Sequence, residues 1–585
     1  MEIDRNALKE SLKYPELDWA FGEMVARRSG RPDDSALKLL SATALRVVEE
    51  SHSCLDLEPW LENFPEKPFP ALGQWIQLIE NEWVEAIATA GVRDHGFEPM
   101  VWLPDCHALY LRQYHQAERE IREYVRNSPR NCAGAPGEEE IRSLSKRFAS
   151  TEAADQVKAV AKVFQRQLSI ITGGPGTGKT TTLAAMLALE LTKNPGLQIA
   201  LCAPTGKAAA QMHDSILIEA EESLNVPAPV KAKLADLPHQ TIHKLLGISR
   251  FNDGKPRFNS DFPLPFELVV VDECSMVDLR LFRMLLNALD RKCRLLLLGD
   301  KDQLDAVEAG KVFSELCSHA EELRLPCARL EKNFRSRENP KLVAFARELV
   351  AGDRAPEKGR ARELAGELFG LAAQPAAERH FWAEEWTGRE KAEVVRGRFQ
   401  GLAAEWLNGL PKWQSAAEAL EHLNDFKVLC AVHDGLCGTR NLNRVLAEIF
   451  LGGRDLGSFP PGLPLMVTRN DDVTGLKNGD VGVCWGGEVH FDGSRKFKPA
   501  QLPEHEIAFA TTVHKAQGGS YQNVVFVLPE QENELLTVNL VYTAITRARK
   551  NCLVLGRPEI LAKALQTATR RWGHLFGNSQ QANCQ

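Results

Sequence analysis

The sequence has no pair of cysteines at C-x-x-C spacing, no apolar signal-peptide core and no apolar run long enough to cross a bilayer. Its 13 cysteines are scattered, and Cys430 and Cys437, which come closest to a pair, do not fit a usual zinc spacing. We therefore expect buried thiols in a reducing compartment rather than a metal site or a disulfide framework. The protein should be cytoplasmic, with no membrane partner.

An excess of positive charge is also lacking. The chain carries 71 basic and 78 acidic side chains, for a formal net charge of -7. This balance does not point to nucleic acid, but net charge reports on solubility more than on sites, so a basic channel inside an acidic protein stays open. With 585 residues, 44% of them hydrophobic, the chain is long enough for three or four domains.

Residues 1–130 are predicted to form a helical domain, because apolar residues recur at helical spacing in SALKLLSATALRVVEE. This stretch has no phosphate loop, metal-ligand spacing or paired catalytic carboxylates. It holds five of the 11 tryptophans, namely Trp19, Trp60, Trp75, Trp83 and Trp102. Tryptophan is enriched in interface anchors, so a self-contained core and a surface that docks a partner both account for these rings.

Two α/β regions follow a linker at residues 127–139. In residues 140–340, continuous apolar runs alternate with helical stretches, which is typical of a parallel sheet covered on both faces. Residues 341–585 repeat this alternation and hold a small all-β insertion near 455–503. Near 248–266, the dipeptide Asp253-Gly254 favours a tight hairpin turn.

A phosphate-binding loop is predicted at GGPGTGKT, residues 173–180, between a strand and a helix. Glycines let backbone N–H groups converge on phosphate, and the helix N-terminus adds a favourable dipole. A glycine-rich turn that binds nothing is the plain alternative. The residues expected to bind the nucleotide are Gly173, Gly174, Pro175, Gly176, Thr177, Gly178, Lys179, Thr180 and Thr181. Lys179 should reach the β- and γ-phosphates of ATP, and Thr180 should ligate Mg²⁺.

Carboxylates at a second strand end indicate hydrolysis. The run VVVDE places Asp272 where it can ligate Mg²⁺, directly or through water, and Glu273 where it can polarise the attacking water. Past a third strand, LLLLGDKDQL places Asp300 and Gln303 beside the γ-phosphate, where Gln303 can sense the loss of that group. We therefore expect an ATPase rather than a passive binder.

Further motifs follow in a fixed order: CAPTGKAA, TIHKLLG, VDECSM, GDKDQL, LEKNFRS, TTVHKAQGGSY and VYTAITRAR. This series resembles superfamily-one DNA helicases and, within them, the RecD family, the alpha subunit of the RecBCD enzyme (exonuclease V). The N-terminal stretches SCLDLEPWL and LYLRQYHQAEREI are similar to the same family, which weighs against the longer stand-alone RecD-like helicases. The resemblance implies two RecA-like P-loop NTPase domains, a helical N-terminal domain and an SH3-like insertion. It also implies that the hairpin near 248–266 lies beside the DNA junction, where it either parts the strands or is a plain surface hairpin.

The resemblance also implies roles for single residues. Gln156 would face the adenine edge, and Arg335 and Arg547 would be arginine fingers that neutralise the γ-phosphate when the two domains close. The residues along the path of single-stranded DNA would be Thr205, Thr241, His243, Thr512 and His514. One departure is Ser520, where relatives usually have an acidic residue, so a contact to nucleotide or DNA is weakened or replaced here.

The function expected from this reading is ATP-dependent 5′→3′ translocation on single-stranded DNA. RecB-like and RecC-like partners would complete a heterotrimer that unwinds and degrades broken double-stranded ends before recombinational repair. Nuclease activity would belong to a partner, since this chain has no nuclease constellation. The alternatives are a stand-alone helicase acting on DNA or RNA, and a non-enzymatic subunit that clamps DNA and regulates a partner.

Overall fold

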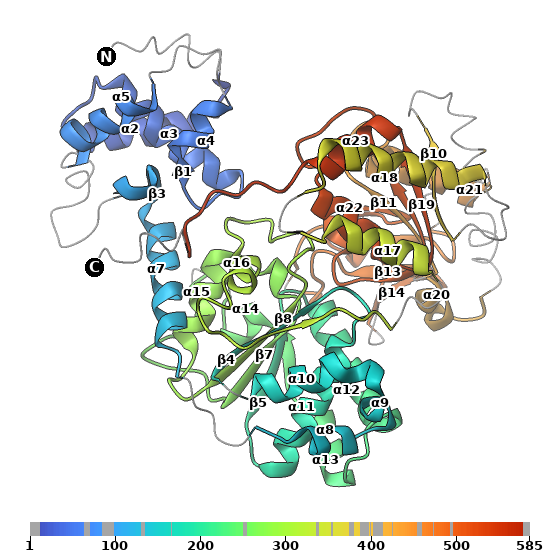
Figure 1. Ribbon diagram of the computed structural model, residues 1–585. Coiled ribbons are helices and arrows are strands. Elements are labelled where there is room, and N and C mark those ends of the chain that lie inside the picture. The colour runs from blue at the N-terminus through green and yellow to red at the C-terminus, as the bar shows by residue number, and fades with distance from the viewer. Residues whose placement is uncertain are drawn as a thin grey trace.

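The protein is seen in a computed structural model as an N-terminal part within residues 12–129 and two α/β domains (Figure 1). After the resemblance, the α/β domains are called motor domain 1, within residues 135–334, and motor domain 2, within residues 339–566. The described residues are 12–63, 71–84, 99–129, 135–164, 166–249, 254–334, 339–352, 355–373, 380–386, 397, 399, 401, 413–423, 425–452, 459–471, 473–491 and 495–576. Within these residues, no helix combines the length and the apolar character that crossing a membrane requires.

The N-terminal part is mainly helical, as predicted. Its α-helices are α2 (Glu16–Arg28), α3 (Ser35–Glu49), α4 (Leu57–Glu62), α5 (Leu72–Leu78) and α7 (Arg112–Asn127). It also holds a small antiparallel sheet that helical periodicity did not predict, in the order β1 (Leu55–Asp56), β3 (Ala108–Leu111) and β2 (Met100–Leu103). These strands are two to four residues long, too short for a period-two pattern to be noticed.

Motor domain 1 is built on a six-stranded parallel sheet. Its strand order is β6 (His239–Thr241), β5 (Ile199–Ala203), β7 (Leu268–Val271), β8 (Arg294–Gly299), β4 (Leu168–Gly173) and β9 (Cys327–Leu330). Alternate residues of β8 join different hydrophobic clusters, with Leu295 and Leu297 in one and Leu296 and Leu298 in the other. Both faces of the sheet are therefore covered, as the continuous apolar runs predicted.

Helices cover the two faces of this sheet (Figure 1). One group contains α8 (Glu138–Ser143), α9 (Lys146–Ala149), α10 (Ala154–Val163), α11 (Lys179–Lys193), α12 (Gly206–Glu222) and α13 (Ala228–Ala235). The other contains α14 (Ile242–Leu245), α15 (Leu279–Ala288) and α16 (Val312–Ser318). The predicted hairpin region has no strand in its described residues 254–266, and Asp253 lies outside the described residues.

Motor domain 2 repeats the parallel arrangement with five strands. Their order is β10 (Phe381–Glu385), β19 (Ala548–Gly556), β18 (Tyr521–Val527), β11 (Phe426–Cys430) and β17 (Ala510–Thr512). The helices of this region are α17 (Pro340–Leu349), α18 (Lys358–Gly370), α20 (Ala416–His422), α21 (Thr439–Leu451), α22 (Val538–Ile545) and α23 (Pro558–Gln566). The two parallel sheets with their helices form two RecA-like α/β motor domains.

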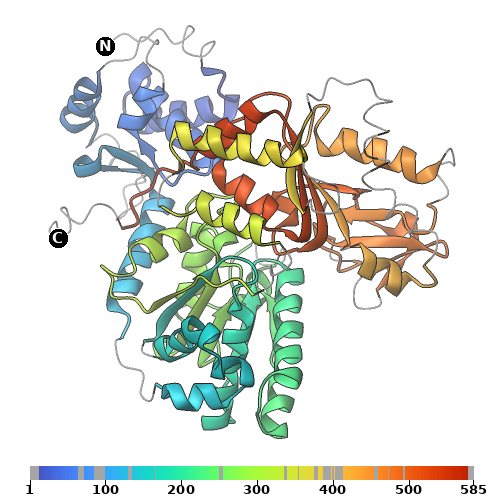
Figure 2. The ribbon, with the colours of Figure 1, turned by 45° about the vertical axis from the view of Figure 1, so that its right-hand side comes forward.

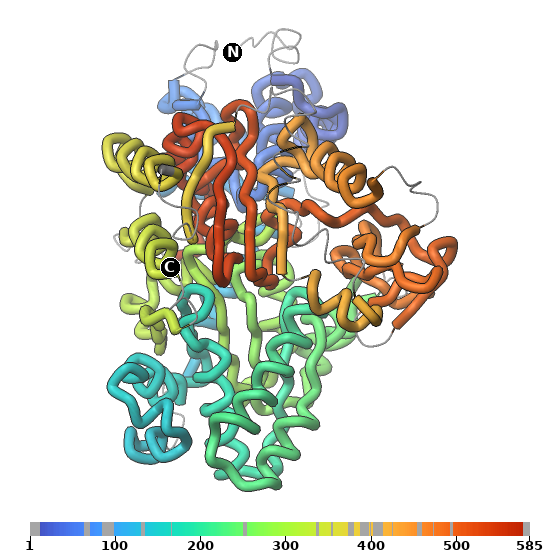
Figure 3. Tube along the Cα trace, turned by 90° about the vertical axis from the view of Figure 1, so that its right-hand side faces the viewer, coloured from blue at the N-terminus to red at the C-terminus, as the bar shows by residue number. Residues whose placement is uncertain are grey.

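A separate antiparallel sheet lies beside motor domain 2 (orange, Figure 3). Its order is β15 (Lys496–Phe497), β14 (Glu488–His490), β13 (Val481–Trp485), β12 (Pro464–Val467) and β16 (His505–Ile507). All four strand pairings are antiparallel. Its last strand lies beyond residue 503, the end expected for the all-β insertion, and SH3-like character stays a prediction.

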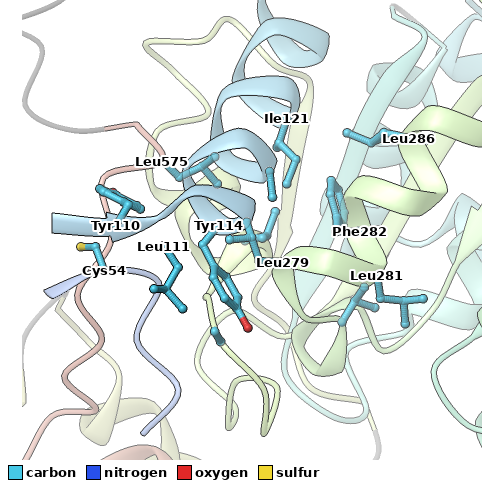
Figure 4. Packing of buried hydrophobic residues seen from close by; sticks show 14 of the residues in the cluster. Cys54, Tyr110, Leu111, Tyr114, Ile121, Leu279, Leu281, Phe282, Leu286 and Leu575 are labelled. Carbon is cyan, nitrogen blue, oxygen red and sulfur yellow. The ribbon is translucent and has the colours of Figure 1, made fainter. Parts of the chain in front are cut away.

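The N-terminal part shares one hydrophobic cluster with motor domain 1. Figure 4 shows Tyr114 and Ile121 of α7 beside Leu279 and Phe282 of α15. At the edge of this contact, the carboxylate of Glu120 on α7 accepts hydrogen bonds of 2.6 and 2.8 Å from the guanidinium of Arg283. Helix α7 is therefore packed into the core of the motor.

An extended segment, residues 567–576, follows α23 and is called here the C-terminal strap. It leaves α23 and crosses back to the N-terminal part (dark red, Figures 1 and 2). Arg122 on α7 donates hydrogen bonds of 2.7 Å to the carbonyls of His574 and Leu575. Leu575 is buried in the cluster that α7 shares with motor domain 1. The strap thus joins motor domain 2 to the other two parts.

Candidate active site

The phosphate loop has the backbone that its glycines predict. Strand β4 ends at Gly173, and α11 begins at Lys179. Gly176 and Gly178 adopt φ angles of +79° and +86°, a region that side-chain-bearing residues rarely enter. The ammonium of Lys179 donates hydrogen bonds to the carbonyls of Gly173 at 2.6 Å and Gly174 at 3.3 Å. Lys179 is thereby held over the loop, where a bound phosphate would meet its charge.

Gln156 packs directly on this loop. Its Nε2 donates to the carbonyls of Thr177 at 3.3 Å and Gly178 at 3.5 Å. A Cβ at position 178 would lie 1.9 Å from that nitrogen, so glycine is required there for packing as well as for φ. Among the described residues, the Oε1 of Gln156 has no hydrogen-bond partner. The expected contact of Gln156 with an adenine edge stays a prediction.

The two threonines after Lys179 differ in their surroundings. The hydroxyl of Thr181 donates a hydrogen bond of 2.7 Å to Glu219 Oε1. The same oxygen accepts a hydrogen bond of 2.8 Å from Nη1 of Arg147. Both Thr180 and Thr181 line the cleft at the loop, but Thr181 is already engaged by the carboxylate of α12. Of the two hydroxyls, that of Thr180 is therefore the better placed for a metal ion.

The paired carboxylates lie at the carboxyl end of β7. The N–H of Glu273 donates at 2.8 Å to Asp272 Oδ1, and Glu273 itself has a φ of +53°. This left-handed conformation is uncommon outside glycine and is found at active sites. Burial raises the pKa of Asp272, the neighbouring charge of Glu273 raises it further, and Lys179 opposes both. The two carboxylates and the ammonium therefore interact within one site.

Gln303 and Asp300 lie where β8 ends, with both side chains buried. Gln303 Nε2 donates to Asp300 Oδ2 at 2.9 Å. The same oxygen accepts a hydrogen bond of 3.1 Å from the hydroxyl of Tyr542, on α22 of motor domain 2. Sequence reasoning misses Tyr542, although it lies in the motif VYTAITRAR that also contains Arg547.

Arg547 is 3% exposed and lies at the boundary of the two motor domains. Its Nε donates to the carbonyl of Thr543 and its Nη1 to that of Gly519, each at 3.1 Å. Within the described part of the chain, its Nη2 has no hydrogen-bond partner. A buried guanidinium with an unused donor is costly unless a further acceptor arrives, and a phosphate oxygen is such an acceptor.

A cleft of about 510 Å³ brings these groups together. Motor domain 1 contributes Gln156, the loop residues, Asp272, Glu273 and Gln303, and motor domain 2 contributes Ser520, Arg547 and Arg549. The hydroxyl of Ser520 accepts hydrogen bonds from Arg549 Nε at 3.0 Å and Nη2 at 2.6 Å. At position 520, where relatives usually have an acidic residue, the serine hydroxyl is therefore bound by Arg549.

The other expected finger, Arg335, lies outside the described residues. The residues before it are held against the phosphate loop. Asn333 Nδ2 donates to the carbonyl of Pro175 and the N–H of Phe334 to that of Gly176, both at 2.8 Å. The role of Arg335 stays a prediction.

Two of the residues expected along the DNA path, Thr205 and Thr241, lie at the carboxyl ends of strands in motor domain 1. Thr205 lies two residues after Ala203, the last residue of β5, and Thr241 is the last residue of β6. Ala203 and Thr241 are paired in the parallel sheet, so the two threonines lie at the same edge. The hydroxyls of Thr205 and Thr241 accept the N–H groups of Ala208 and Lys244 and so cap α12 and α14. These threonines have a structural role, which neither confirms nor excludes a contact to DNA.

His243, Thr512 and His514 complete the expected path. His243 is exposed on α14, and Thr512 ends β17 in motor domain 2. Burial, followed by the charge of Arg571, lowers the pKa of His514, which favours a neutral ring. Motor domain 1 thus brings Thr205, Thr241 and His243 to one edge, while Thr512 and His514 belong to motor domain 2. Their contacts with DNA stay predictions.

Two family models match parts of this chain. One is described as an AAA domain and matches residues 151–366, which cover the phosphate loop, the paired carboxylates and Gln303. The other is described as a UvrD-like helicase C-terminal domain and matches residues 507–555, which contain Thr512, His514 and Arg547. The matched segments therefore come from both sides of the cleft.

Curated relatives match over most of the chain. The RecBCD enzyme subunit RecD of Haemophilus influenzae is 34% identical over 513 residues, which are 79% of this chain and 79% of that protein. The RecBCD enzyme subunit RecD of Mycolicibacterium smegmatis is 31% identical over 558 residues, covering 92% and 93%. The ATP-dependent RecD2 DNA helicase of Deinococcus radiodurans is 29% identical over 473 residues, which are 79% of this chain but 56% of that protein.

Proposed function

The chain belongs to the RecD family of superfamily-one DNA helicases, and we propose that it is an ATP-driven motor moving 5′→3′ on single-stranded DNA. In this proposal it is the RecD-like subunit of a cytoplasmic heterotrimer with RecB-like and RecC-like chains. The complex would unwind and process double-strand breaks for recombinational repair. Any nuclease activity would come from a partner.

The observation that carries the motor proposal is the composition of the cleft. Lys179 and Glu273 come from one motor domain and Arg547 from the other, so the charges needed for phosphoryl transfer lie on both sides of a domain boundary. ATP would bind at the phosphate loop, with Lys179 on its β- and γ-phosphates. Arg547 would supply its unused Nη2 to the γ-phosphate as the cleft closes.

Thr180 and Asp272 are the residues that would hold Mg²⁺, which neutralises charge on the phosphates when it is bound. Glu273 would accept a proton from the attacking water, since its carboxylate lines the same cleft. Burial raises the pKa of Asp272, and a cation bound beside it would lower that pKa and so favour the charged carboxylate. The residues present therefore fit the nucleotide and its metal.

Contacts between the motor domains offer a route from hydrolysis to movement. The N–H of Leu304 donates to Thr543 Oγ1, and its carbonyl accepts from Gln517 Nε2, both at 3.0 Å. Leu304 follows Gln303 directly, and Gln517 follows His514 by three residues. A shift at the γ-phosphate would thus reach the residues proposed to hold DNA in motor domain 2 through hydrogen bonds.

DNA would lie across the edge formed by Thr205, Thr241 and His243 and continue to Thr512 and His514. Hydroxyls, imidazoles and backbone amides hold phosphates without reading bases, as a motor that tracks along any sequence requires. Opening and closing of the cleft would change the spacing between these two groups and so advance the strand.

The N-terminal part would dock the RecC-like partner. Leu17 and Met24 of α2 are 66% and 36% exposed and lie seven residues apart, so both project from one side of the helix. In Figure 1, α2 lies far from both motor sheets. Exposed apolar side chains in such a position support contact with another protein chain.

The proposal is tested by measuring ATP hydrolysis by the purified chain as single-stranded DNA and then single-stranded RNA are added. We expect stimulation by DNA that weakens as salt is raised, because phosphate contacts release counterions. Equal stimulation by RNA would favour a helicase of broader substrate range. Hydrolysis that does not respond to either nucleic acid would favour a regulatory subunit that clamps DNA.

A further inference from the structure

Tyr542 links the two motor domains at a single carboxylate oxygen. It is 5% exposed, and its hydroxyl donates to Asp300 Oδ2 at 3.1 Å. Asp300 is 1% exposed, and the same oxygen accepts the Nε2 of Gln303 at 2.9 Å. One oxygen of motor domain 1 therefore receives a donor from its own domain and a donor from motor domain 2.

This arrangement fixes the orientation of Gln303. An ionised carboxylate only accepts hydrogen bonds, so Gln303 must present its amide nitrogen to Asp300. The amide oxygen of Gln303, Oε1, therefore points away from Asp300. Among the described residues, it has no hydrogen-bond partner. Gln303 lines the same cleft as Lys179 and Glu273, where a free carbonyl oxygen can accept a hydrogen bond from the attacking water and so orient it.

Gly174 leaves the room that Tyr542 occupies. A Cβ at position 174 would lie 2.8 Å from the tyrosine hydroxyl, so any side chain there would displace it. The phosphate-loop pattern G-x-x-x-x-G-K-T does not specify glycine at this second position. The glycine is therefore explained by the approach of motor domain 2 rather than by phosphate binding.

The hydroxyl of Tyr542 stays protonated and so remains a hydrogen-bond donor. Burial and then the charge of Asp300 raise the pKa of Tyr542 well above the ordinary value of 10.0, so its proton is retained at neutral pH. Without this donor, the carboxylate of Asp300 would accept one hydrogen bond fewer, and its side chain would rotate more freely. Gln303 would lose its fixed orientation as a result.

We infer that Tyr542 is a positioning residue for ATP hydrolysis, which holds Asp300 and through it Gln303 whenever the two motor domains are engaged. The inference rests on the proposed function, because it assigns a part in the hydrolysis that the cleft performs. It makes correct placement of Gln303 depend on contact with motor domain 2, so that turnover is favoured in the engaged state.

The test is Tyr542→Phe, which removes the hydroxyl and keeps the ring. DNA-stimulated kcat should fall about tenfold, the loss typical of one hydrogen bond to a charged group, while KM for ATP stays within about twofold. The matched control is Asn539→Ala on the same helix, which removes a 3.0 Å hydrogen bond to the carbonyl of Asp302 and leaves Asp300 untouched. This control should stay near the wild-type kcat.

A wild-type kcat in Tyr542→Phe, or an equal loss in Asn539→Ala, would overturn the inference and leave the proposed function standing. No turnover by the wild-type chain would overturn both. A second measurement places Tyr542→Phe in a Gln303→Ala background, where it should cause no further loss if it acts through Gln303. Additive losses in that background would show a general structural role and would overturn the inference.

Discussion

The imidazole of His52 stacks on the indole of Trp572, with ring centroids 4.1 Å apart, although the two residues lie 520 positions apart in the chain. The backbone N–H of Trp572 also donates a hydrogen bond of 2.7 Å to His52 Nδ1. This contact fixes the C-terminal strap to the N-terminal part. Arg571, the preceding residue, donates to the carbonyl of Gly310 at 2.7 Å in motor domain 1.

The strap therefore reaches the segment that follows Gln303. Arg571 also contacts the carbonyls of Ala306 and Glu308, and the hydroxyl of Ser51 contacts the carbonyl of Val307. The N-terminal part and the C-terminal strap thus both hold residues 306–310. Loss of these contacts should loosen a loop that begins two residues after Leu304, the point where motor domain 2 is attached.

The His52 contact should weaken in acid. Burial, followed by the charge of Arg571, lowers the pKa of His52 from 6.5 to about 4. The unfolded chain then takes up the proton first, so the stability that neutral His52 contributes is complete above about pH 6.5 and is lost as the pH falls towards 4. The Tm advantage of the wild type over His52→Gln should therefore shrink between neutral and acid pH. A difference that is constant with pH would contradict this assignment.

Arg547→Ala should retain ATP binding and lose turnover. An arginine finger acts mainly on the transition state, and a loss of about a thousandfold in kcat is ordinary for such a residue. ATP affinity from equilibrium binding and kcat from steady-state hydrolysis check the two parts separately. Arg444→Ala, at an exposed arginine paired with Glu448 on α21, is the control and should leave both unchanged. Joint loss of binding and of the folded state would assign Arg547 a structural role instead.

Partner docking should fail when the exposed apolar side chains of α2 are charged. The variant Leu17→Glu/Met24→Glu is expected to lose co-purification with RecB-like and RecC-like chains while keeping DNA-stimulated hydrolysis. Point substitutions are preferable to deleting the N-terminal part, because α7 shares its core with motor domain 1. Leu535→Glu, at a 59% exposed leucine of motor domain 2, is the control. Normal assembly of the double variant would place the docking surface elsewhere.

His243→Ala should weaken the response to DNA without changing the response to ATP. The side chain is exposed and caps no helix, unlike Thr241 beside it. We expect a higher DNA concentration for half-maximal hydrolysis, with an unchanged KM for ATP at saturating DNA. A change in KM for ATP alone would move His243 from the DNA path to the nucleotide site.

The fold of the motor core was predictable because its signals are local. The apolar run ending at Gly173, the glycines and the helix beginning at Lys179 are contiguous, and the continuous runs of β7 and β8 require burial on both faces. The order of motifs then indicated that Arg547 belongs to the same site as Lys179. Both residues line one cleft, and the role of Arg547 as an arginine finger stays a prediction.

The contacts that sequence reasoning missed join residues far apart in the chain. Tyr542 and Asp300 are 242 positions apart, and no periodicity relates a tyrosine on one helix to an aspartate after a distant strand. The strap was missed for the same reason. Its segment has no repeating apolar pattern, and its partners, such as His52, Arg122 and Gly310, lie hundreds of positions away in the chain. Strands as short as β1 leave no period-two signal to read.

The central claim is that ATP hydrolysis at the cleft drives movement along single-stranded DNA. It is tested most directly by displacement of a labelled strand from duplexes with a 5′ or a 3′ single-stranded tail, with wild type and Lys179→Ala measured side by side. The wild type should displace the strand from the 5′-tailed duplex only when ATP and Mg²⁺ are present, and Lys179→Ala should not displace it while remaining folded. Equal displacement by Lys179→Ala, or none by the wild type under conditions where it binds the duplex, would contradict the account.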